Sequence, residues 1–209
     1  MYTPNPFRQT DKAQLVRHIY MSRLATLVSE GDHGLLATHL PLLFDEEAGQ
    51  HGTLYGHLAR GNPQWRDLVA ASETLIIFQG PDAYVTPAWY PAKAAHGKVV
   101  PTWNYTAVHA YGKPEVFDDA DRLRSVVTRL TEKAEASQMA PWSVSDAPPD
   151  YIDGMLRAIV GIAIPVTRME GSWKLSQNRP QSDMEGICVG LSASDDPRDL
   201  ALLNVMQPG

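Results

Sequence analysis

The amino-acid sequence predicts an α+β fold, mainly β, with flanking helices. Runs of β-branched and aromatic residues, several of them alternating with polar residues, recur over the first 117 residues, a pattern typical of strands. Apolar residues at helical spacing then mark amphipathic helices in the second half. The sequence has no repeat and no low-complexity linker, so we expect residues 1–209 to form a single domain with C-terminal helices.

The first predicted helix covers residues 11–23. Thr10 stands immediately before it, where a side chain is needed to cap the first free backbone N–H groups. Leu15 and Ile19 lie four residues apart, so we expect both to face the core.

The next part of the chain predicts strands around a short helix. Residues 24–44 are rich in Leu, Thr and Val and are broken by turn-forming residues at 30–34, which indicates a hairpin. Residues 51–59 predict another strand. A short helix then follows, with Asn62 as a good cap and Pro63 as a good first helical residue.

The middle of the chain predicts strands interrupted by proline and glycine. We expect the apolar run of 74–80 to be a buried strand that ends at the GPDA sequence, and a separate short strand to follow at 83–91. Alternation over 99–117 predicts long strands that bend near Pro101 and Gly112.

The last third predicts three helices and one long strand. The apolar stripe in 118–137 is typical of an amphipathic helix, and a short helical turn is expected at 151–156. Residues 159–171 resume strand character. Met184, Ile187, Cys188 and Leu191 share one helical face, and Asp196 with Pro197 begins a final helix.

Composition excludes several functional classes. A formal net charge of −6 gives no global attraction to nucleic acid, so DNA contact would need a local basic patch. Cys188 is the single cysteine, and the first residues, MYTPNPFRQT, lack the pattern of a secretory signal. No apolar run is long enough to cross a bilayer. We therefore expect a cytoplasmic protein without a membrane segment.

A candidate phosphate site lies in YGHLARGNPQW, where a strand turns into a helix. Free N–H groups at a helix start attract phosphate, and the guanidinium of Arg60 adds a bidentate partner. His57 and Asn62 flank this arginine. An ordinary capped helix after a tight turn explains the same residues.

A candidate site for a flat heteroaromatic ring lies in LLATHLPLLF. Thr38 and His39 break an apolar run, and Pro41 removes a backbone donor from the strand, so exposed backbone could bind the edge of a ring. Edge-strand geometry with a core histidine is the alternative interpretation.

A third candidate group combines VPTWNYTAVHAYG with WKLSQNRP. Its residues supply neutral donors and acceptors, one positive charge and a wide apolar surface, which together match an isoalloxazine ring and a ribityl phosphate. They are Thr102, Trp103, Asn104, Lys174 and Gln177. The alternative is that the aromatic residues pack the interior and the lysine is solvated.

Several catalytic motifs are missing from the sequence. It contains no HExxH, CxxC, GxGxxG, Walker-type lysine loop or GxSxG, so zinc, dinucleotide, nucleoside-triphosphate and serine-hydrolase chemistry lack their usual parts. The seven histidines are scattered. We therefore predict no metal site.

Six motifs in order carry a family resemblance over nearly the whole chain: MYTPNPF, THLPLL, GHLARGNPQW, FQGPDAYVTPAWY, VPTWNYTAVHAYG and KLSQNRP. In this combination the sequence resembles the PaiB family of FMN-binding negative transcriptional regulators. The resemblance implies a pyridoxamine-phosphate-oxidase-like split β-barrel, which binds FMN at the interface of a homodimer.

The resemblance also implies where the cofactor lies. The strand that holds residues 38–39 would face the flavin ring, and residues 102–104 would complete the pocket. His57, Arg60 and Asn62 would lie by the phosphate. Lys174 and Gln177 would reach the cofactor of the same or the opposite subunit. No catalytic acid, base or nucleophile carries over, so enzymatic activity stays open.

Three functions remain after this resemblance. The first is an FMN-binding transcriptional regulator, with promoter DNA as a partner; the acidic residues interleaved with arginines in 118–137 instead indicate a solvated helix face. The second is a flavin-dependent oxidoreductase, or a haem-handling relative with His39, His57 or His109 as iron ligand. The third is a flavin-storing or interaction protein with neither activity.

Overall fold

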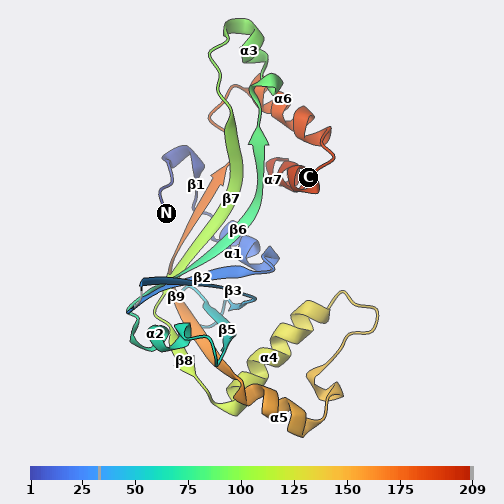
Figure 1. Ribbon diagram of the computed structural model, residues 1–209. Coiled ribbons are helices and arrows are strands. Elements are labelled where there is room, and N and C mark those ends of the chain that lie inside the picture. Colours follow the sequence, from blue (N-terminus) through green and yellow to red (C-terminus); the bar gives the residue numbers. More distant parts are fainter. Residues whose placement is uncertain (33, 208–209) are drawn as a thin grey trace. The chain divides into compact units, whose positions relative to one another are not determined.

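The computed structural model describes residues 1–32 and 34–207 (Figure 1). The strands are β1 (Arg8–Gln9), β2 (Ala25–Gly31), β3 (Gly34–Leu40), β4 (Leu43–Asp45), β5 (Thr53–Ala59), β6 (Thr74–Val85), β7 (Thr102–Gly112), β8 (Glu115–Phe117) and β9 (Ile159–Lys174). The α-helices are α1 (Lys12–Met21), α2 (Gln64–Ala70), α3 (Pro91–His96), α4 (Ala120–Glu135), α5 (Pro149–Arg157), α6 (Gln181–Ser192) and α7 (Pro197–Met206). Short 3-10 turns lie at Asn5–Phe7, Pro87–Trp89 and Val144–Asp146.

Hydrogen bonds connect the main strands in the order β3-β2-β6-β7-β9-β5-β4, while β1 and β8 each pair with β9. The pairings β1–β9, β2–β3, β2–β6, β4–β5, β5–β9 and β8–β9 are all antiparallel. In this register Thr26 lies opposite His39, and His57 lies opposite Gly161. The predicted α+β, mainly β fold with flanking helices is confirmed.

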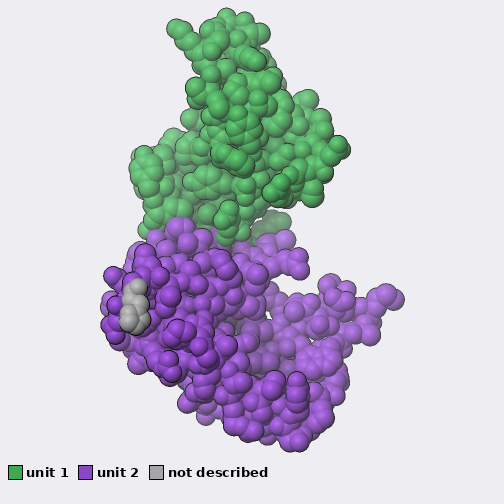
Figure 2. Space-filling model, in the orientation of Figure 1, with its two compact units in different colours: residues 1–18, 79–108, 170–209 green, residues 19–78, 109–169 purple. Residues whose placement is uncertain are grey.

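The chain forms two compact units, which are interleaved in sequence (Figure 2). Unit 1 contains Met1–His18, Gln79–Val108 and Glu170–Gly209, and unit 2 contains Ile19–Phe78 and His109–Met169. By these ranges β6, β7 and β9 contribute residues to both units. That residues 1–209 form a single domain stays a prediction.

Each unit has an apolar cluster that its helices cover. In unit 2, α4 and α5 lie side by side (Figure 1) and pack on a buried cluster. Its members are Phe117, Leu123, Val126, Val144, Ile152, Leu156 and Ala163. In unit 1, α6 and α7 pack on Ala83, Val85, Tyr90, Ile187, Leu191 and Leu202. The predicted helical stripes are therefore core contacts, as expected from their spacing.

Two predictions, the cap of the first helix and the end of the strand at 74–80, are wrong. The α1 cap is Asp11, not Thr10, because the Asp11 carboxylate accepts the Ala13 N–H at 2.9 Å. Residues 80–83 do not end a strand either, since β6 runs on to Val85. Gly80 meets a packing need there: a Cβ at this position would lie 2.1 Å from the Thr106 hydroxyl of β7.

The other predicted elements are present within one to three residues of their expected ends, apart from the segment 83–91. That segment holds the end of β6 and the Pro87–Trp89 turn. The hairpin of 24–44 is β2 and β3; His33, in its predicted turn, lies outside the described residues. Asn62 accepts the Gln64 N–H at 3.0 Å and so caps α2, which begins one residue after Pro63. Within the described part of the chain, no helix is both long and apolar enough to cross a membrane.

Candidate functional site

A polar network fastens the start of α2 to the middle of β3 in unit 2. The Thr38 hydroxyl donates to the Gln64 carboxamide oxygen at 2.5 Å, and the Asn62 amide donates to the Thr38 oxygen at 2.9 Å. Because Asn62 also caps α2, two of the predicted site residues hold each other in place. Their positions are fixed by the fold before any ligand binds.

Gln64 is the centre of this network and was not predicted as a site residue. Its side chain is 1% exposed, and its amide nitrogen lies within hydrogen-bond distance of the Leu27 carbonyl, the Ser29 hydroxyl and the Leu36 carbonyl. A buried carboxamide needs such partners, because an unpaired one is costly. Because α2 also contains Arg66 and Asp67, a polar residue at this position gives no distinct signal in the sequence.

The network limits what Thr38 can offer to a ligand. Its single hydroxyl proton is directed to Gln64, so its remaining capacity is to accept a hydrogen bond. The second amide proton of Asn62 remains to donate one. Thr38 therefore offers a ligand a neutral acceptor, and Asn62 offers it a neutral donor.

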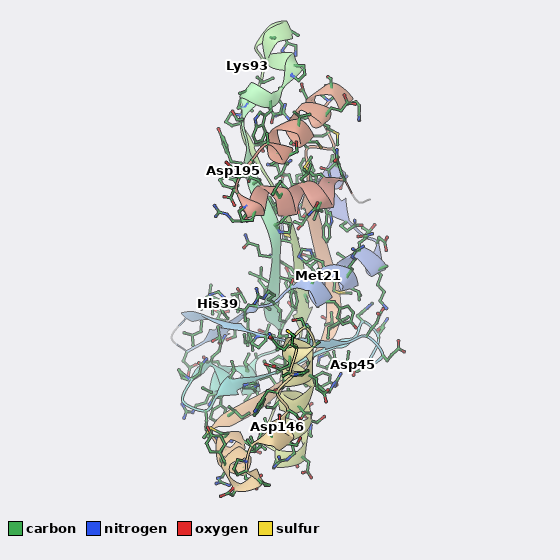
Figure 3. All side chains as sticks on the ribbon, turned by 90° about the vertical axis from the view of Figure 1, so that its right-hand side faces the viewer. Met21, His39, Asp45, Lys93, Asp146 and Asp195 are labelled. Atoms are coloured by element: carbon green, nitrogen blue, oxygen red, sulfur yellow. The ribbon has the colours of Figure 1, made fainter. Side chains whose placement is uncertain are left out.

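His39 does not join Thr38. Consecutive strand residues point to opposite faces of a sheet, and the His39 Nδ1 instead lies 3.0 Å from the Thr26 hydroxyl of β2. The side chain is exposed on β3, where Figure 3 labels it. The two predicted ring contacts therefore do not converge through their side chains.

His57 lies half-buried on β5, with an unused nitrogen. Its Nδ1 is buried and makes no hydrogen bond within the described residues. Burial lowers the pKa of its imidazole below the ordinary 6.5, so the ring is neutral near pH 7. His57 therefore offers a hydrogen bond to a ligand, and not a positive charge.

Arg60 lies at the C-terminal end of α5. Its guanidinium donates to the Arg157 carbonyl at 2.9 Å and to the Ile159 carbonyl at 3.1 Å. A cation is favourable there, because the carbonyl end of a helix carries partial negative charge. Arg60 thus has a structural role that the sequence did not reveal, and its contact with a phosphate stays a prediction.

In unit 1, the side chain of Lys174 forms hydrogen bonds with the first two residues of β7. Its ammonium donates to the Thr102 hydroxyl and, at 2.8 Å, to the Trp103 carbonyl. Burial, and then the positive charge of Arg179, lower the pKa of Lys174. The structure therefore brings together three of the five residues predicted in this group.

Asn104 and Gln177 form hydrogen bonds that stabilise the loop after β9. Asn104 is fully buried, and its carboxamide oxygen accepts the Ser176 hydroxyl at 3.0 Å. Gln177 accepts the Leu175 N–H at 2.7 Å and donates to the Trp173 carbonyl at 2.5 Å. Between them Ser176 has a φ of 62°, a conformation that needs such support. A cofactor contact from Gln177 would have to replace one of these bonds.

Trp103 presents its indole to a cavity in unit 1. The side chain is 55% exposed and meets the ring of Tyr84 edge-on, with 5.9 Å between the ring centroids. The cavity holds about 380 Å³. It is lined by Asp82, Ala83, Tyr84, Thr86, Trp89, Trp103, Asp196, Arg198 and Asp199.

A second cavity, of about 610 Å³, lies in unit 2. It is lined by Arg60, Asp118, Ala120, Leu123, Asp153, Leu156 and Arg157. No three His, Cys, Asp or Glu side chains among residues 1–32 and 34–207 are grouped as metal ligands.

Each unit carries groups of a kind that a flavin can use. Unit 2 supplies neutral groups at the end of β5 and the start of α2, including the unused His57 nitrogen. Unit 1 supplies the exposed indole of Trp103 and the ammonium of Lys174. A flavin needs an apolar surface for its ring, neutral partners for the ring edge and donors for its phosphate.

Comparison with known proteins gives the family. Residues 1–168 match the family model FMN_bind_2, described as "Putative FMN-binding domain". The chain is 34% identical over 207 residues to the protease synthase and sporulation protein PAI 2 of Bacillus subtilis, covering 99% of this chain and 97% of that protein. The resemblance predicted from six motifs is therefore confirmed.

Solved structures confirm the fold. A conserved hypothetical protein of Mycobacterium tuberculosis aligns with a TM-score of 0.58 and 15% identity over 87% of this chain and 95% of that one. The FAD and haem binding protein of Mycobacterium smegmatis aligns with a TM-score of 0.57 and 16% identity over 88% of this chain and 80% of that one. The family match and the full-length Bacillus relative together show that this chain belongs to the PaiB family of FMN-binding split β-barrel proteins.

Proposed function

We propose that this protein is a cytoplasmic, homodimeric regulator of PaiB type whose activity depends on bound FMN. The observation that carries the proposal is the alignment with the Bacillus sporulation protein, which covers 99% of this chain and so includes α6 and α7 beyond the FMN-binding match. Similarity over that length indicates a shared function more strongly than a shared cofactor domain alone.

The predicted cofactor-binding residues are the candidates for the contacts with FMN. His57, Asn62 and Arg60 would lie by the phosphate, Thr38 would accept from the ring edge, and Lys174 would donate to the cofactor beside the Trp103 indole. Bound FMN supplies electron transfer and a redox state that can act as a signal. Among these residues His57 would bind as a neutral group, because burial lowers the pKa of its imidazole, whereas Arg60 would contribute a positive charge.

Homodimer formation is supported by the exposed edge of the sheet. β3 ends the hydrogen-bonded order of strands, and most of its residues are exposed. An edge strand carries unpaired N–H and C=O groups that a second chain can cover. Light scattering coupled to size-exclusion chromatography tests this: a mass of twice 23.0 kDa is expected, and a monomer in the presence of FMN would contradict it.

Direct repression would require promoter DNA as a partner. Carboxylates pair with several arginines of α4: Arg122 with Glu115, Arg124 with Asp153 and Arg129 with Asp45. This neutralised surface agrees with the solvated helix face expected from the sequence, and it gives α4 little attraction to phosphates.

A gel-shift titration of the FMN-loaded protein against its promoter tests direct repression. Binding that weakens steeply between low and moderate salt is the expected result. Absence of salt-sensitive binding would overturn direct repression and leave FMN binding standing. Repeating the titration with the apoprotein shows whether DNA binding depends on the flavin.

A flavin-dependent oxidoreductase is the second candidate function. The cavity of about 380 Å³ beside the exposed Trp103 indole favours it, because a substrate needs access next to the flavin. The measurement is reduction of the bound flavin by nicotinamide donors, followed by exposure to oxygen. A flavin that neither accepts electrons nor reacts with oxygen after reduction would exclude this function.

The haem-handling alternative depends on His57. Its Nδ1 is buried and unpartnered, whereas the Nδ1 of His39 lies 3.0 Å from a threonine hydroxyl. Neutral imidazole is also the form that binds iron. Titration of the apoprotein with haem would give a shifted Soret band that is lost in His57→Ala, and an unshifted band would remove this alternative.

A further inference from the structure

We propose that Lys174 and Arg179 form a binding site for an oxyanion, either a phosphate or a carboxylate group. Both side chains belong to unit 1, and both reach the same short segment of chain before and at the start of β7. Lys174 donates to the Trp103 carbonyl at 2.8 Å, and Arg179 donates to the Val100 carbonyl at 3.3 Å. Two residues, Pro101 and Thr102, lie between Val100 and Trp103, so the two side chains bind carbonyls of one short segment, and the charge of Arg179 acts on Lys174.

In the part of the chain that the structure describes, no carboxylate forms an ion pair with either side chain. Among residues 1–32 and 34–207, neither Lys174 nor Arg179 takes part in an ion pair. The acidic group in their surroundings is Asp183, which is 1% exposed and acts electrostatically on Tyr90. Its carboxylate accepts the Ala92 N–H at 3.1 Å and is thereby directed to α3.

The neighbouring positive charge of Arg179 affects the pKa of Lys174. Burial and the neighbouring Arg179 both lower the pKa of Lys174, so the ammonium form is disfavoured where it stands. A bound oxyanion would remove this repulsion and favour the charged form again. Both groups keep donors for it, because an ammonium has a third N–H and a guanidinium has several more.

An unused donor lies next to the arginine. The guanidinium of Arg179 stands over the ring of Tyr90, 4.2 Å from the ring centroid. Tyr90 is 2% exposed, and its hydroxyl is buried without a hydrogen-bond partner in the described chain. A buried hydroxyl of this kind requires an explanation, and an oxyanion held by Arg179 would supply an acceptor.

Two sources could supply the oxyanion: the phosphate of FMN, or the anionic group of a separate ligand. The proposed function assigns the FMN phosphate to residues 57–62, in unit 2. The Lys174–Arg179 site does not depend on that assignment. It predicts that the apoprotein binds an oxyanion without any flavin.

The test uses inorganic phosphate as the probe, titrated by calorimetry into the full-length apoprotein at constant ionic strength. Saturable binding is expected. Lys174→Gln and Arg179→Gln should each weaken it by roughly 10-fold or more, because each removes a charged hydrogen bond. Arg8→Gln is the matched control, since Arg8 is exposed in the same unit and its side chain makes no hydrogen bond, ion pair or ring contact among the described residues; it should leave the affinity unchanged.

The charge-retaining variant Arg179→Lys distinguishes an effect of lost positive charge from an effect of lost folding. It should keep most of the phosphate affinity, and circular dichroism should show that all variants remain folded. Wild-type protein that binds no phosphate saturably, or Arg179→Gln that binds it as well as wild type, would overturn the proposal.

Two further titrations identify the source. If FMN fills the site, FMN abolishes phosphate binding, and Arg179→Gln weakens the binding of FMN but not of riboflavin. If a separate ligand fills it, the FMN-loaded protein still binds phosphate and Arg179→Gln leaves FMN affinity unchanged. Either result supports the oxyanion site. If the wild-type protein binds phosphate but does not bind FMN, the proposed function is overturned and the oxyanion site still stands.

Discussion

The Thr38 hydroxyl and the Gln64 carboxamide oxygen are 2.5 Å apart, so β3 and α2 are joined by a buried amide. Both residues of the predicted site that lie here, Thr38 and Asn62, are held by this contact. The position of Asn62, and with it the end of the strand that carries His57, therefore depends on a side chain that does not itself face solvent.

Replacement of Gln64 should destabilise the protein. Gln64→Ala leaves the Thr38 hydroxyl and two backbone carbonyls without their partner and opens a cavity, so we expect a loss of about 2–4 kcal/mol in the free energy of unfolding. Urea unfolding measures it. Gln14→Ala, at an exposed position of α1, is the control and should change stability by less than about 0.5 kcal/mol. A similar small change for Gln64→Ala would show that the network is not stabilising.

Two helical glycines should respond oppositely to alanine. A Cβ at Gly186 of α6 would lie 2.0 Å from the Trp89 carbonyl oxygen, which is backbone and cannot easily move. Gly186→Ala should therefore cost about 2 kcal/mol or more. At Gly154 of α5 the nearest atom is 3.8 Å away, so Gly154→Ala should stabilise by about 0.5–1 kcal/mol. Thermal melting of both variants checks the sign, and equal shifts would contradict the packing of α6 on Trp89.

Protonation of His57 should lower stability in acid. Burial holds the folded-state pKa of His57 below 6.5, so the unfolded chain takes up this proton at higher pH than the folded protein does. The His57 contribution is absent above pH 6.5, becomes destabilising as the pH falls below 6.5, and levels off below the folded-state pKa. Urea unfolding from about pH 5 to 8 should show this slope in wild type and in the exposed control His96→Gln. His57→Gln should flatten it, and an unchanged slope in that variant would contradict the burial effect.

Replacement of Arg60 should weaken the binding of FMN more than the binding of riboflavin. If Arg60 lies by the phosphate, Arg60→Ala removes charged hydrogen bonds worth about 1.5–3 kcal/mol of FMN affinity. Arg66→Ala is the control, because this exposed arginine of α2 lies over Trp65 instead. Fluorescence titration with both flavins decides. Unchanged FMN affinity would place the phosphate elsewhere, and an equal loss for both flavins would leave Arg60 with only its structural bonds to the Arg157 and Ile159 carbonyls.

Much of the fold was predictable from periodicity and caps. The apolar stripe around Leu123 and Val126 predicts α4, and Asp196 with Pro197 predicts the start of α7, since both signals are local. The continuation of β6 through Gly80 was not predictable. A glycine that admits a neighbouring strand and a glycine that makes a turn look the same in one sequence.

The candidate site was predictable in part, for the same physical reason. Motif chemistry grouped Lys174 with Thr102, which the structure brings together. It placed Thr38 and Asn62 in two separate motifs, and the structure joins these two as well. It could not show that Arg60 binds carbonyls nearly a hundred residues away, or that Asn104 is buried. Partners so distant along the chain leave no local pattern.

The central claim is that the protein binds FMN and recognises its phosphate. Absorbance and fluorescence titration of the purified protein with FMN, beside a titration with riboflavin, tests it most directly. Saturable binding of FMN that is clearly tighter than binding of riboflavin is the predicted result. Binding of neither flavin, or equal affinity for both, would contradict it.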